Sequence, residues 1–316
     1  MAPLEKQSQA STRSQRPDVF LFSQVRTASN LLSRMLSTQP GWTQSLYHFR
    51  PSHISAVDLS CQGGLSREQY EELKAELGKA FDQLEQARQA AIAEDTSLFV
   101  KNHLCNVLQP STVLKGITDT RPIIHPQDAA ARTTNPTIFS DEYLLQWKPI
   151  FLIRHPLLVI ESWYKAETRV RPIDVHDQTW YSHTTFHFIR HLYDWYVTRA
   201  DAGQQPVVID ADDVIDGGEA LAKLCQECGM DKESIRYEWD AKPVEKNGSA
   251  SPRSMSFMGG IWMSRGVDKG KSSRVVDEEN KYEEWKREFG EEVGGVLRGL
   301  VEREMLDYEY MKRRAV

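Results

Sequence analysis

Short apolar runs that alternate with helical segments constrain the fold of this chain more than any other feature of its sequence. The runs lie at 19–23, 98–101, 149–154 and 206–210, and each is dominated by Val, Ile, Leu or Phe. A strand buried on both faces gives such a run, whereas a half-exposed strand alternates apolar and polar residues. Strands that alternate with helices are typical of a parallel sheet covered on both faces. We therefore predict an α/β fold with a doubly wound parallel sheet and helices on both of its faces.

The helical segments are predicted from apolar spacing near 3.6 residues and from capping patterns. Ser66-Arg-Glu-Gln69 matches a capping box and begins a long helix that continues to about residue 94. A helix at 156–168 follows the third apolar run. Further helices are expected at 31–36, 180–200, 218–228 and 278–313. Residues 245–275 are rich in Gly, Ser and Lys without clear periodicity, which predicts a mobile loop.

The length and charge of the chain exclude several classes of protein. Its 316 residues are enough for one large α/β domain, and we see no internal repeat or linker that would divide them. We expect a disordered segment at 1–16 and a single domain at 17–316. The net charge is −6, and the acidic surplus falls largely on predicted helices at 68–94 and 277–309. A net acidic chain is a poor general binder of nucleic acid or anionic membranes, so neither is an expected partner.

Targeting patterns favour a cytoplasmic protein. No stretch approaches the ~20 uncharged apolar residues of a transmembrane helix, and residues 1–17 lack the apolar core of a secretory signal. The cysteines are too sparse for a disulfide scaffold.

Two patterns have the spacing of metal ligands. Cys225-x-x-Cys228 lies in an amphipathic helix and has no second pair to complete a site, so packing on that helix is the favoured interpretation. His183, His187 and His191 fall on one face of the predicted helix at 180–200. No HExxH motif is present, and no carboxylate or cysteine evidently completes this set. We therefore expect no metal site.

Basic residues gather where the predicted strands end. Arg26 follows the first run, Lys101 ends the second with His103 close behind, and Arg154 ends the third. Parallel sheets present their ligand sites at the carboxyl ends of the strands, and cations that converge on a helix N-terminus suit a polyanion. Each residue also has a structural alternative. Lys101 could be solvated, His103 could bind a backbone carbonyl, and Arg154 could form a salt bridge.

Three of these segments together resemble the motifs of the sulfotransferase family. Residues 23–32, Ser-Gln-Val-Arg-Thr-Ala-Ser-Asn-Leu-Leu, resemble the loop that binds the 5′-phosphosulfate. Residues 151–162 resemble the 3′-phosphate motif, and Lys101-Asn-His103 is similar to the segment that carries the catalytic base. The motifs occur in the family's order, and the resemblance covers about residues 18–230. It implies a fold of the P-loop, sulfotransferase-like type.

The loop departs from the family pattern at three positions. Val25 stands where the family has Pro, Ala28 where it has Gly, and Asn30 where it has Ser or Thr. Ala28 matters most, because Gly tolerates positive φ and the close approach of a phosphate better than Ala does.

The resemblance implies 3′-phosphoadenosine 5′-phosphosulfate as co-substrate. His103 would be the catalytic base, Lys101 would stabilise the sulfuryl oxygens, and Arg26 would balance charge on the leaving phosphate. The 3′-phosphate would be bound by Arg154 and Ser162, and by charge from Arg265 or Lys269 in the late segment. The 5′-phosphosulfate loop would comprise Arg26, Thr27, Ala28, Ser29, Asn30 and Leu31.

We therefore expect a sulfotransferase that acts on a hydroxyl or amine of a small, apolar acceptor such as a secondary metabolite. Aromatic residues of the helix at 180–200 could line an apolar acceptor pocket. One alternative is a protein of this fold repurposed for other metabolite chemistry or for nucleotide binding, in keeping with the changes at Ala28 and Asn30. Another is a P-loop kinase or NTPase, which the absence of G-x-x-x-x-G-K-[ST] disfavours.

Overall fold

The computed structural model describes residues 16–54, 65–113, 134–176, 181–242 and 250–316. The predicted disordered segment at 1–16 therefore lies, apart from its last residue, outside the described residues. No helix in the described ranges is both long and apolar enough to cross a lipid bilayer.

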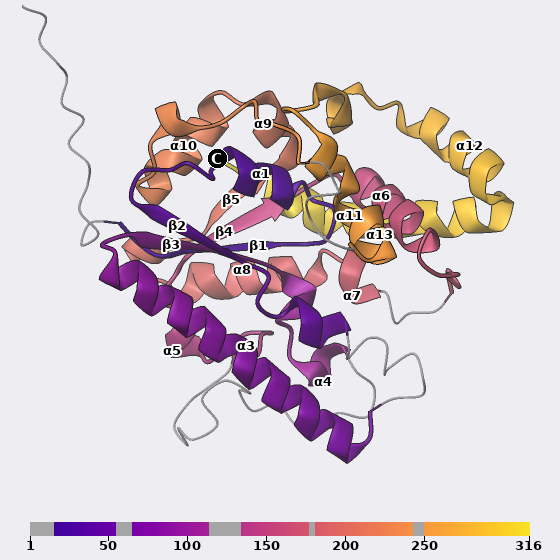
Figure 1. Ribbon diagram of the computed structural model, residues 1–316. Coiled ribbons are helices and arrows are strands. Elements are labelled where there is room, and N and C mark those ends of the chain that lie inside the picture. Colours follow the sequence, from indigo (N-terminus) through magenta and orange to yellow (C-terminus); the bar gives the residue numbers. More distant parts are fainter. Residues whose placement is uncertain (1–15, 55–64, 114–133, 177–180, 243–249) are drawn as a thin grey trace, which may run out of the picture.

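The centre of the molecule is a parallel sheet, as predicted (Figure 1). Its strands follow the order β2-β3-β1-β4-β5, and every neighbouring pair runs in the same direction. The strands are β1 (Val19–Ser23), β2 (Trp42–Leu46), β3 (Ser97–His103), β4 (Lys148–Ile153) and β5 (Val207–Asp210). The sequence did not predict β2. This edge strand, Trp-Thr-Gln-Ser-Leu, is only partly buried and carries no continuous apolar run.

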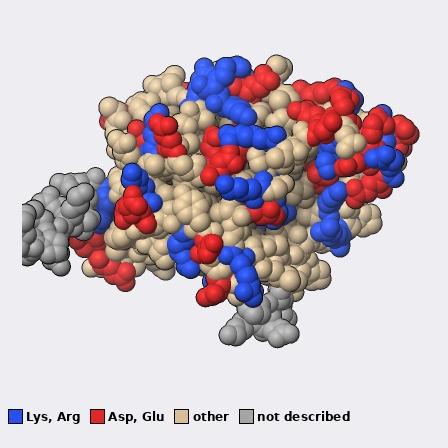
Figure 2. All heavy atoms as spheres, turned by 90° about the horizontal axis from the view of Figure 1, so that it is seen from above, with Lys and Arg blue, Asp and Glu red and all other residues tan. Residues whose placement is uncertain are grey.

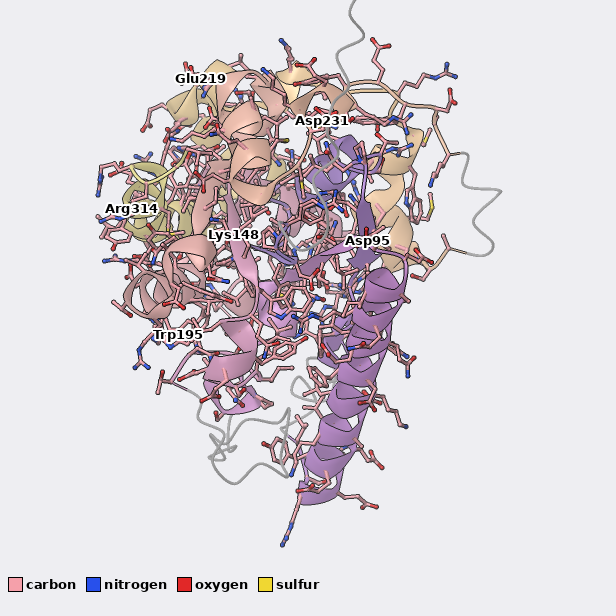
Figure 3. The ribbon with its side chains drawn as sticks, turned by 90° about the vertical axis from the view of Figure 1, so that its left-hand side faces the viewer. Asp95, Lys148, Trp195, Glu219, Asp231 and Arg314 are labelled. Atoms are coloured by element: carbon pink, nitrogen blue, oxygen red, sulfur yellow. The ribbon has the colours of Figure 1, made fainter. Side chains whose placement is uncertain are left out.

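Helices cover both faces of the sheet, which completes the predicted doubly wound arrangement. One face packs against α1 (Ser29–Met35), α9 (Ala211–Asp216) and α10 (Glu219–Cys228). The other face packs against α3 (Arg67–Ala93), α5 (Asp141–Leu144), α8 (His187–Arg199) and α13 (Glu291–Lys312). Figure 3 shows α3 extending from its carboxyl end near Asp95 well beyond the strands. The remaining helices are α4 (Pro110–Val113), α6 (Pro156–Thr168), α7 (Tyr181–Thr184), α11 (Pro252–Met263) and α12 (Glu278–Phe289).

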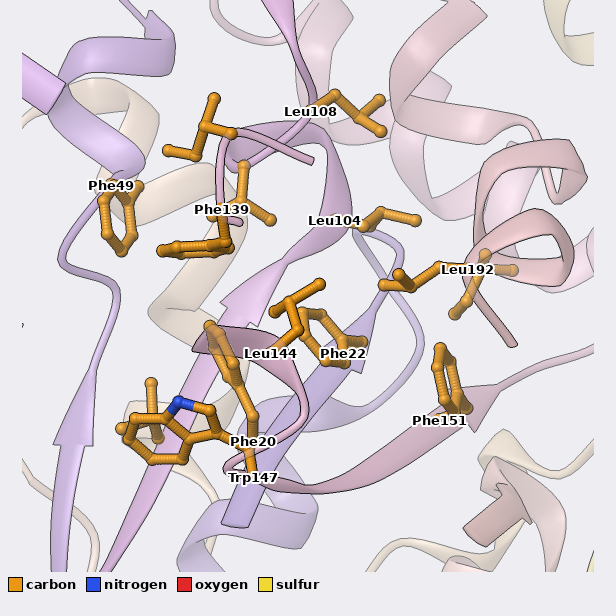
Figure 4. Close-up of a cluster of buried hydrophobic side chains, with 14 of the residues drawn as sticks. Phe20, Phe22, Phe49, Leu104, Leu108, Phe139, Leu144, Trp147, Phe151 and Leu192 are labelled. Carbon is orange, nitrogen blue, oxygen red and sulfur yellow. The ribbon is translucent and has the colours of Figure 1, made fainter. Parts of the chain in front are cut away.

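Residues of β1 alternate between the two cores because successive side chains of a strand point to opposite faces. Val19 and Leu21 pack beneath α1, whereas Phe20 and Phe22 enter the cluster on the α3 side. Figure 4 shows this cluster, in which Phe139 lies among aromatic side chains. Its ring centroid is 5.8 Å from that of Phe20, 5.4 Å from Phe49 and 5.3 Å from Tyr143.

The prediction of one helix at 180–200 is wrong in one respect, because the helix is interrupted between α7 and α8. Buried Glu304 of α13 accepts hydrogen bonds from the Phe186 amide at 2.7 Å and the Thr185 hydroxyl at 3.1 Å. The Phe186 amide therefore bonds to Glu304, whereas in a continuous helix it would have bonded to a carbonyl of the same helix. His183 therefore lies on α7, apart from His187 and His191 on α8, so the three do not share one helix face.

The loop expected at 245–275 instead contains α11. Pro252 occupies the first turn, and the Ser251 side chain caps the helix by accepting from the Ser254 amide. Gly259 is the one buried residue of this helix, so no apolar stripe marked it in the sequence. The predicted C-terminal helix is likewise two helices, α12 and α13, which meet at Gly290 with φ 94°.

Cys225 and Cys228 are free thiols buried in the core between α10 and the sheet. Burial raises the pKa of Cys225 to about 11 and that of Cys228 to about 12. Both are packing residues, as the sequence favoured.

Phe139→Ala should lower the free energy of unfolding by about 3–5 kcal/mol, because the side chain is fully buried among rings that cannot collapse into the space it leaves. Urea unfolding measures the loss. The matched control is Leu306→Ala, a side chain 75% exposed, for which we expect a change within about 0.5 kcal/mol. A loss below about 1 kcal/mol for Phe139→Ala would contradict the described core.

Candidate active site

A cavity of about 680 Å³ lies at the carboxyl ends of β1, β3 and β4. This is the edge at which a parallel sheet presents its ligand site. Its walls come from the loop after β1, the segments after β2 and β3, and helices α6 and α11. The predicted site residues that line it are Arg26, Ala28, Ser29, Asn30, Leu31, His103, Arg154 and Arg265.

The loop after β1 turns through two left-handed residues. Arg26 has φ 66°, and Ala28, which precedes α1, has φ 62°. Ala28 thus holds the conformation for which glycine is best suited. Thr27, predicted to contact the ligand, is fully buried, and its hydroxyl donates to the Gln24 carbonyl at 2.8 Å. Thr27 therefore shapes the loop from within.

Arg26 joins three parts of the site. Its Nε donates to the Ser162 hydroxyl of α6 at 2.8 Å, and its Nη1 donates to the Phe257 carbonyl of α11 at 2.7 Å. Burial, followed by the positive charge of Arg154, lowers the pKa of Arg26 to about 10. The guanidinium remains charged at neutral pH. Ser162 thus lies against Arg26 and orients it.

Arg154 follows β4, and two backbone carbonyls fix the orientation of its guanidinium. Its Nη1 donates to the Arg26 carbonyl at 3.0 Å and its Nη2 to the Lys271 carbonyl at 2.7 Å. Its Nε is buried and has no hydrogen-bond partner in the described part of the chain. No carboxylate of the described residues lies within salt-bridge distance of Arg154, so the structural alternative raised by the sequence is absent there.

Lys101 is fully buried and does not line the cavity wall formed by the described residues. Its Nζ donates to Asn30 Oδ1 at 2.5 Å and lies 4.3 Å from the centre of the Tyr47 ring. Burial lowers its pKa well below 10.5. The alternative of a solvated strand end is therefore not observed. Lys101, which the resemblance places on the sulfuryl oxygens, contacts the loop through Asn30.

His103 lies between two hydroxyls. Its Nδ1 is 3.0 Å from Ser23 Oγ, and its Nε2 is 3.2 Å from the Tyr47 hydroxyl. The ring therefore bonds to side chains, and the sequence alternative of a backbone carbonyl partner is not observed. Burial and then the charge of Lys101 lower its pKa well below 6.5. In the neutral tautomer that donates Nδ1–H to Ser23, Nε2 carries the lone pair that can accept a proton.

The sequence reasoning missed Tyr47, the residue that connects these groups. Its hydroxyl donates to Asn30 Oδ1 at 3.1 Å, and burial raises its pKa to about 12. Tyr47 follows β2 directly, so recognition of that strand would have placed it at the same edge as Arg26 and His103.

Glu167 and Arg253 were also missed. Glu167 is 2% exposed and accepts hydrogen bonds from both terminal nitrogens of Arg253, one of them at 2.8 Å. This pair links α6 to α11 across the cavity wall. No short sequence motif marks it, since its residues lie far apart along the chain.

The late phosphate segment contributes less than predicted. Arg265 lines the cavity, but Lys269 is exposed and lies outside the described wall. Lys271 lines the wall in its place, and its carbonyl holds Arg154.

The outer surface and the cavity wall differ in the sign of their charged side chains. Figure 2 shows basic and acidic side chains interspersed, with acidic groups gathered on the side where α12 lies. The cavity wall instead carries a clear excess of basic residues, namely Arg26, Arg50, Arg154, Arg169, Arg253, Arg265 and Lys271. A net acidic protein therefore holds a local basic pocket.

Ala28→Gly should raise the free energy of unfolding by about 0.5–1 kcal/mol, because glycine has no penalty at positive φ. The matched control is Ala75→Gly on the exposed face of α3, which should lower it by about 1 kcal/mol. Urea unfolding of both variants measures the change in the free energy of unfolding, which should be positive for Ala28→Gly and negative for Ala75→Gly. A loss at Ala28 as large as that at Ala75 would contradict the left-handed loop.

Comparison with known proteins points to one family. No protein-family model matches the chain. The chain is 29% identical over 322 residues to "Sulfotransferase ppzF" of Metarhizium rileyi, with 93% of this chain and 95% of the relative covered. It is 28% identical over 324 residues to the protein of the same name from Metarhizium majus, with the same coverage.

Two solved structures are similar at a looser level. The sulfotransferase domain of the Synechococcus PCC 7002 olefin synthase has a TM-score of 0.42 at 20% identity, covering 83% of this chain and 88% of that domain. The sulfotransferase domain of the curacin biosynthetic pathway has a TM-score of 0.44 at 13% identity, covering 86% and 97%. Similarity this loose carries no argument about function. The two sequence relatives match nearly the whole chain, which is therefore similar along almost all of its length to proteins named sulfotransferase.

Proposed function

We propose that the protein transfers a sulfuryl group from 3′-phosphoadenosine 5′-phosphosulfate to a hydroxyl or amine of a small acceptor, with His103 as the base. The observation that carries the proposal is a single basic cavity on which Arg26, Arg154 and neutral His103 converge. A sulfuryl donor needs cations for its phosphates, and its acceptor needs a nearby group that takes a proton.

The donor site is supported by an unsatisfied atom. The buried Nε of Arg154 has no partner among the described residues, and a buried donor in this state is costly unless a ligand bonds to it. Two backbone carbonyls each accept one hydrogen bond from Nη1 and Nη2, so Nε and the remaining hydrogens of the guanidinium are left for an anion. Arg154 would bind the 3′-phosphate there. Lys271 and Arg265 on the same wall would add charge.

Arg26 would act at the opposite end of the donor. Hydrogen bonds to Ser162 and Phe257 fix its guanidinium, so its charge needs no rearrangement during the reaction. As the sulfur–oxygen bond to the 5′-phosphate breaks, that phosphate gains negative charge, which Arg26 would balance. Lys101 would contribute through Asn30, which it holds in the loop.

His103 would handle the proton of the acceptor. The acceptor oxygen forms the new bond to sulfur, its proton moves to Nε2 of His103, and the adenosine bisphosphate leaves with the electron pair of the broken bond. The Tyr47 hydroxyl lies 3.2 Å from the same nitrogen and lines the cavity, so an acceptor hydroxyl would have to take its place against Nε2.

The acceptor would be small and at least partly apolar. Trp163 of α6, together with Phe257 and Ile261 of α11, supplies apolar wall near the base. The aromatic residues of α8 do not, because Tyr193, Trp195 and Tyr196 are buried in the core. The acceptor pocket would therefore be lined by α6 and α11, and not by α8 as the sequence predicted.

3′-Phosphoadenosine 5′-phosphate, the product form of the donor, should stabilise the protein in a thermal-shift titration. At 100 times its Kd it should add about 2.7 kcal/mol. Arg154→Ala should abolish the response, whereas Arg199→Ala, an exposed arginine on α8, should leave it intact. Stabilisation by ATP with Mg²⁺ and not by this nucleotide would sink the proposal in favour of a kinase or NTPase.

His103→Ala should lower kcat by about 10²–10⁴-fold while it preserves the thermal response to the nucleotide, because the base acts on the acceptor and not on the donor. Donor consumption with a panel of simple phenols measures the rate. His191→Ala, an exposed histidine on α8, is the control and should retain full activity. Equal donor consumption by wild type and His103→Ala would remove His103 from the chemistry and favour a repurposed site.

A further inference from the structure

Two histidines and a cysteine meet on the wall of the cavity, next to the proposed base. His53 comes from the segment after β2, Cys105 from the 3₁₀ turn at Leu104–Asn106, and His183 from α7. Their ligand atoms all lie within 4.8 Å of one another, and the Nε2 atoms of the two histidines are 3.0 Å apart. All three residues line the cavity.

This spacing fits a shared metal ion. Tetrahedral Zn²⁺ binds nitrogen at about 2.0–2.1 Å and thiolate sulfur at about 2.3 Å, which separates two nitrogen ligands by roughly 3.3 Å. The observed separation of 3.0 Å between the imidazole nitrogens is close to that value, and the three ligand atoms, all within 4.8 Å of one another, would draw slightly closer around a bound ion. Cys105 also donates to Asn106 Oδ1 at 3.6 Å and packs against Val25 and Trp163, so its thiol lies beside both histidines in a dry part of the wall.

We propose that His53, Cys105 and His183 bind Zn²⁺, with three protein ligands and a fourth position open to the cavity. Three ligands with an open position is the arrangement of catalytic rather than structural zinc sites.

The neighbouring charges set the conditions for binding. Arg253 lies close enough to His53 to help lower the pKa of the imidazole, and its charge also opposes a bound cation. Its ion pair with Glu167 offsets part of that opposition. The thiolate of Cys105 would supply a further negative charge when the metal displaces its proton.

The open position would bind the oxygen or nitrogen of the acceptor. A metal lowers the pKa of a bound hydroxyl, which makes the proton easier for His103 to take. This role rests on the proposed sulfuryl transfer, whereas binding of the metal itself does not. The two claims can therefore fail separately.

Cobalt(II) is the probe for the site, because a tetrahedral Co²⁺ ion with a thiolate ligand absorbs in both the visible and the near-ultraviolet. The full-length protein is stripped with a chelator and titrated with Co²⁺. We expect one equivalent to bind, with both absorptions present, and Zn²⁺ to displace it. Cys105→Ser should remove the near-ultraviolet band.

Variants of the histidines provide the second arm. His53→Ala and His183→Ala should each weaken Co²⁺ binding at least about tenfold, since even loss of a supporting contact to a metal ligand has an effect of this size. His187→Ala and His191→Ala on α8 should bind as wild type does. Circular dichroism and the thermal response to the nucleotide, whose proposed Arg154 contact lies on another part of the wall, check that each variant is folded.

Absence of stoichiometric Co²⁺ binding to the wild-type chain would overturn the site whatever the variants do. A near-ultraviolet band that survives in Cys105→Ser would place the metal elsewhere and would overturn it equally. Co²⁺ binding at this cluster without any response to the nucleotide would support the metal site and contradict the proposed function instead.

Discussion

The hydrogen bond from buried Lys101 to Asn30 is the contact on which the site depends. It ties β3 to the loop after β1 beneath the floor of the cavity. An ammonium group taken fully out of water is costly unless it is partnered, so the carbonyl oxygen of Asn30 and the face of Tyr47 must both stay in place. Because Tyr47 in turn contacts His103, the buried amino group links the loop after β1 to the base.

The two arginines of the site, Arg26 and Arg154, also connect parts of the scaffold. Arg154 donates to the carbonyl of Arg26, and Arg26 donates to Ser162 and to Phe257. The ends of β1 and β4 and helices α6 and α11 are therefore joined by guanidinium groups that also face the cavity. Two like charges so close are tolerable because each guanidinium bonds to neutral oxygens. The binding residues and the scaffold are thus the same residues.

The sequence predicted most of the sheet because four strands are buried on both faces and show it in their composition. It missed β2, whose polar residues resemble those of a loop, and with β2 it missed Tyr47. It also missed α11, because side chains that line a cavity follow no apolar period. The break before α8 could not be read locally, since it depends on Glu304 more than a hundred residues later. The motif residues Arg26, His103 and Arg154 meet at one cavity, but Lys101 and Thr27 lie behind its wall.

The central place of β1 has a consequence for the order in which the chain can assemble. Val19 pairs with Phe99 on one side and with Lys148 on the other, so the first strand to be synthesised has no partner until much later segments have emerged. Contacts between residues this far apart in sequence form slowly. During that interval the run Val-Phe-Leu-Phe would be exposed on the nascent chain. A chaperone that covered this run during that interval would protect the growing chain from aggregation.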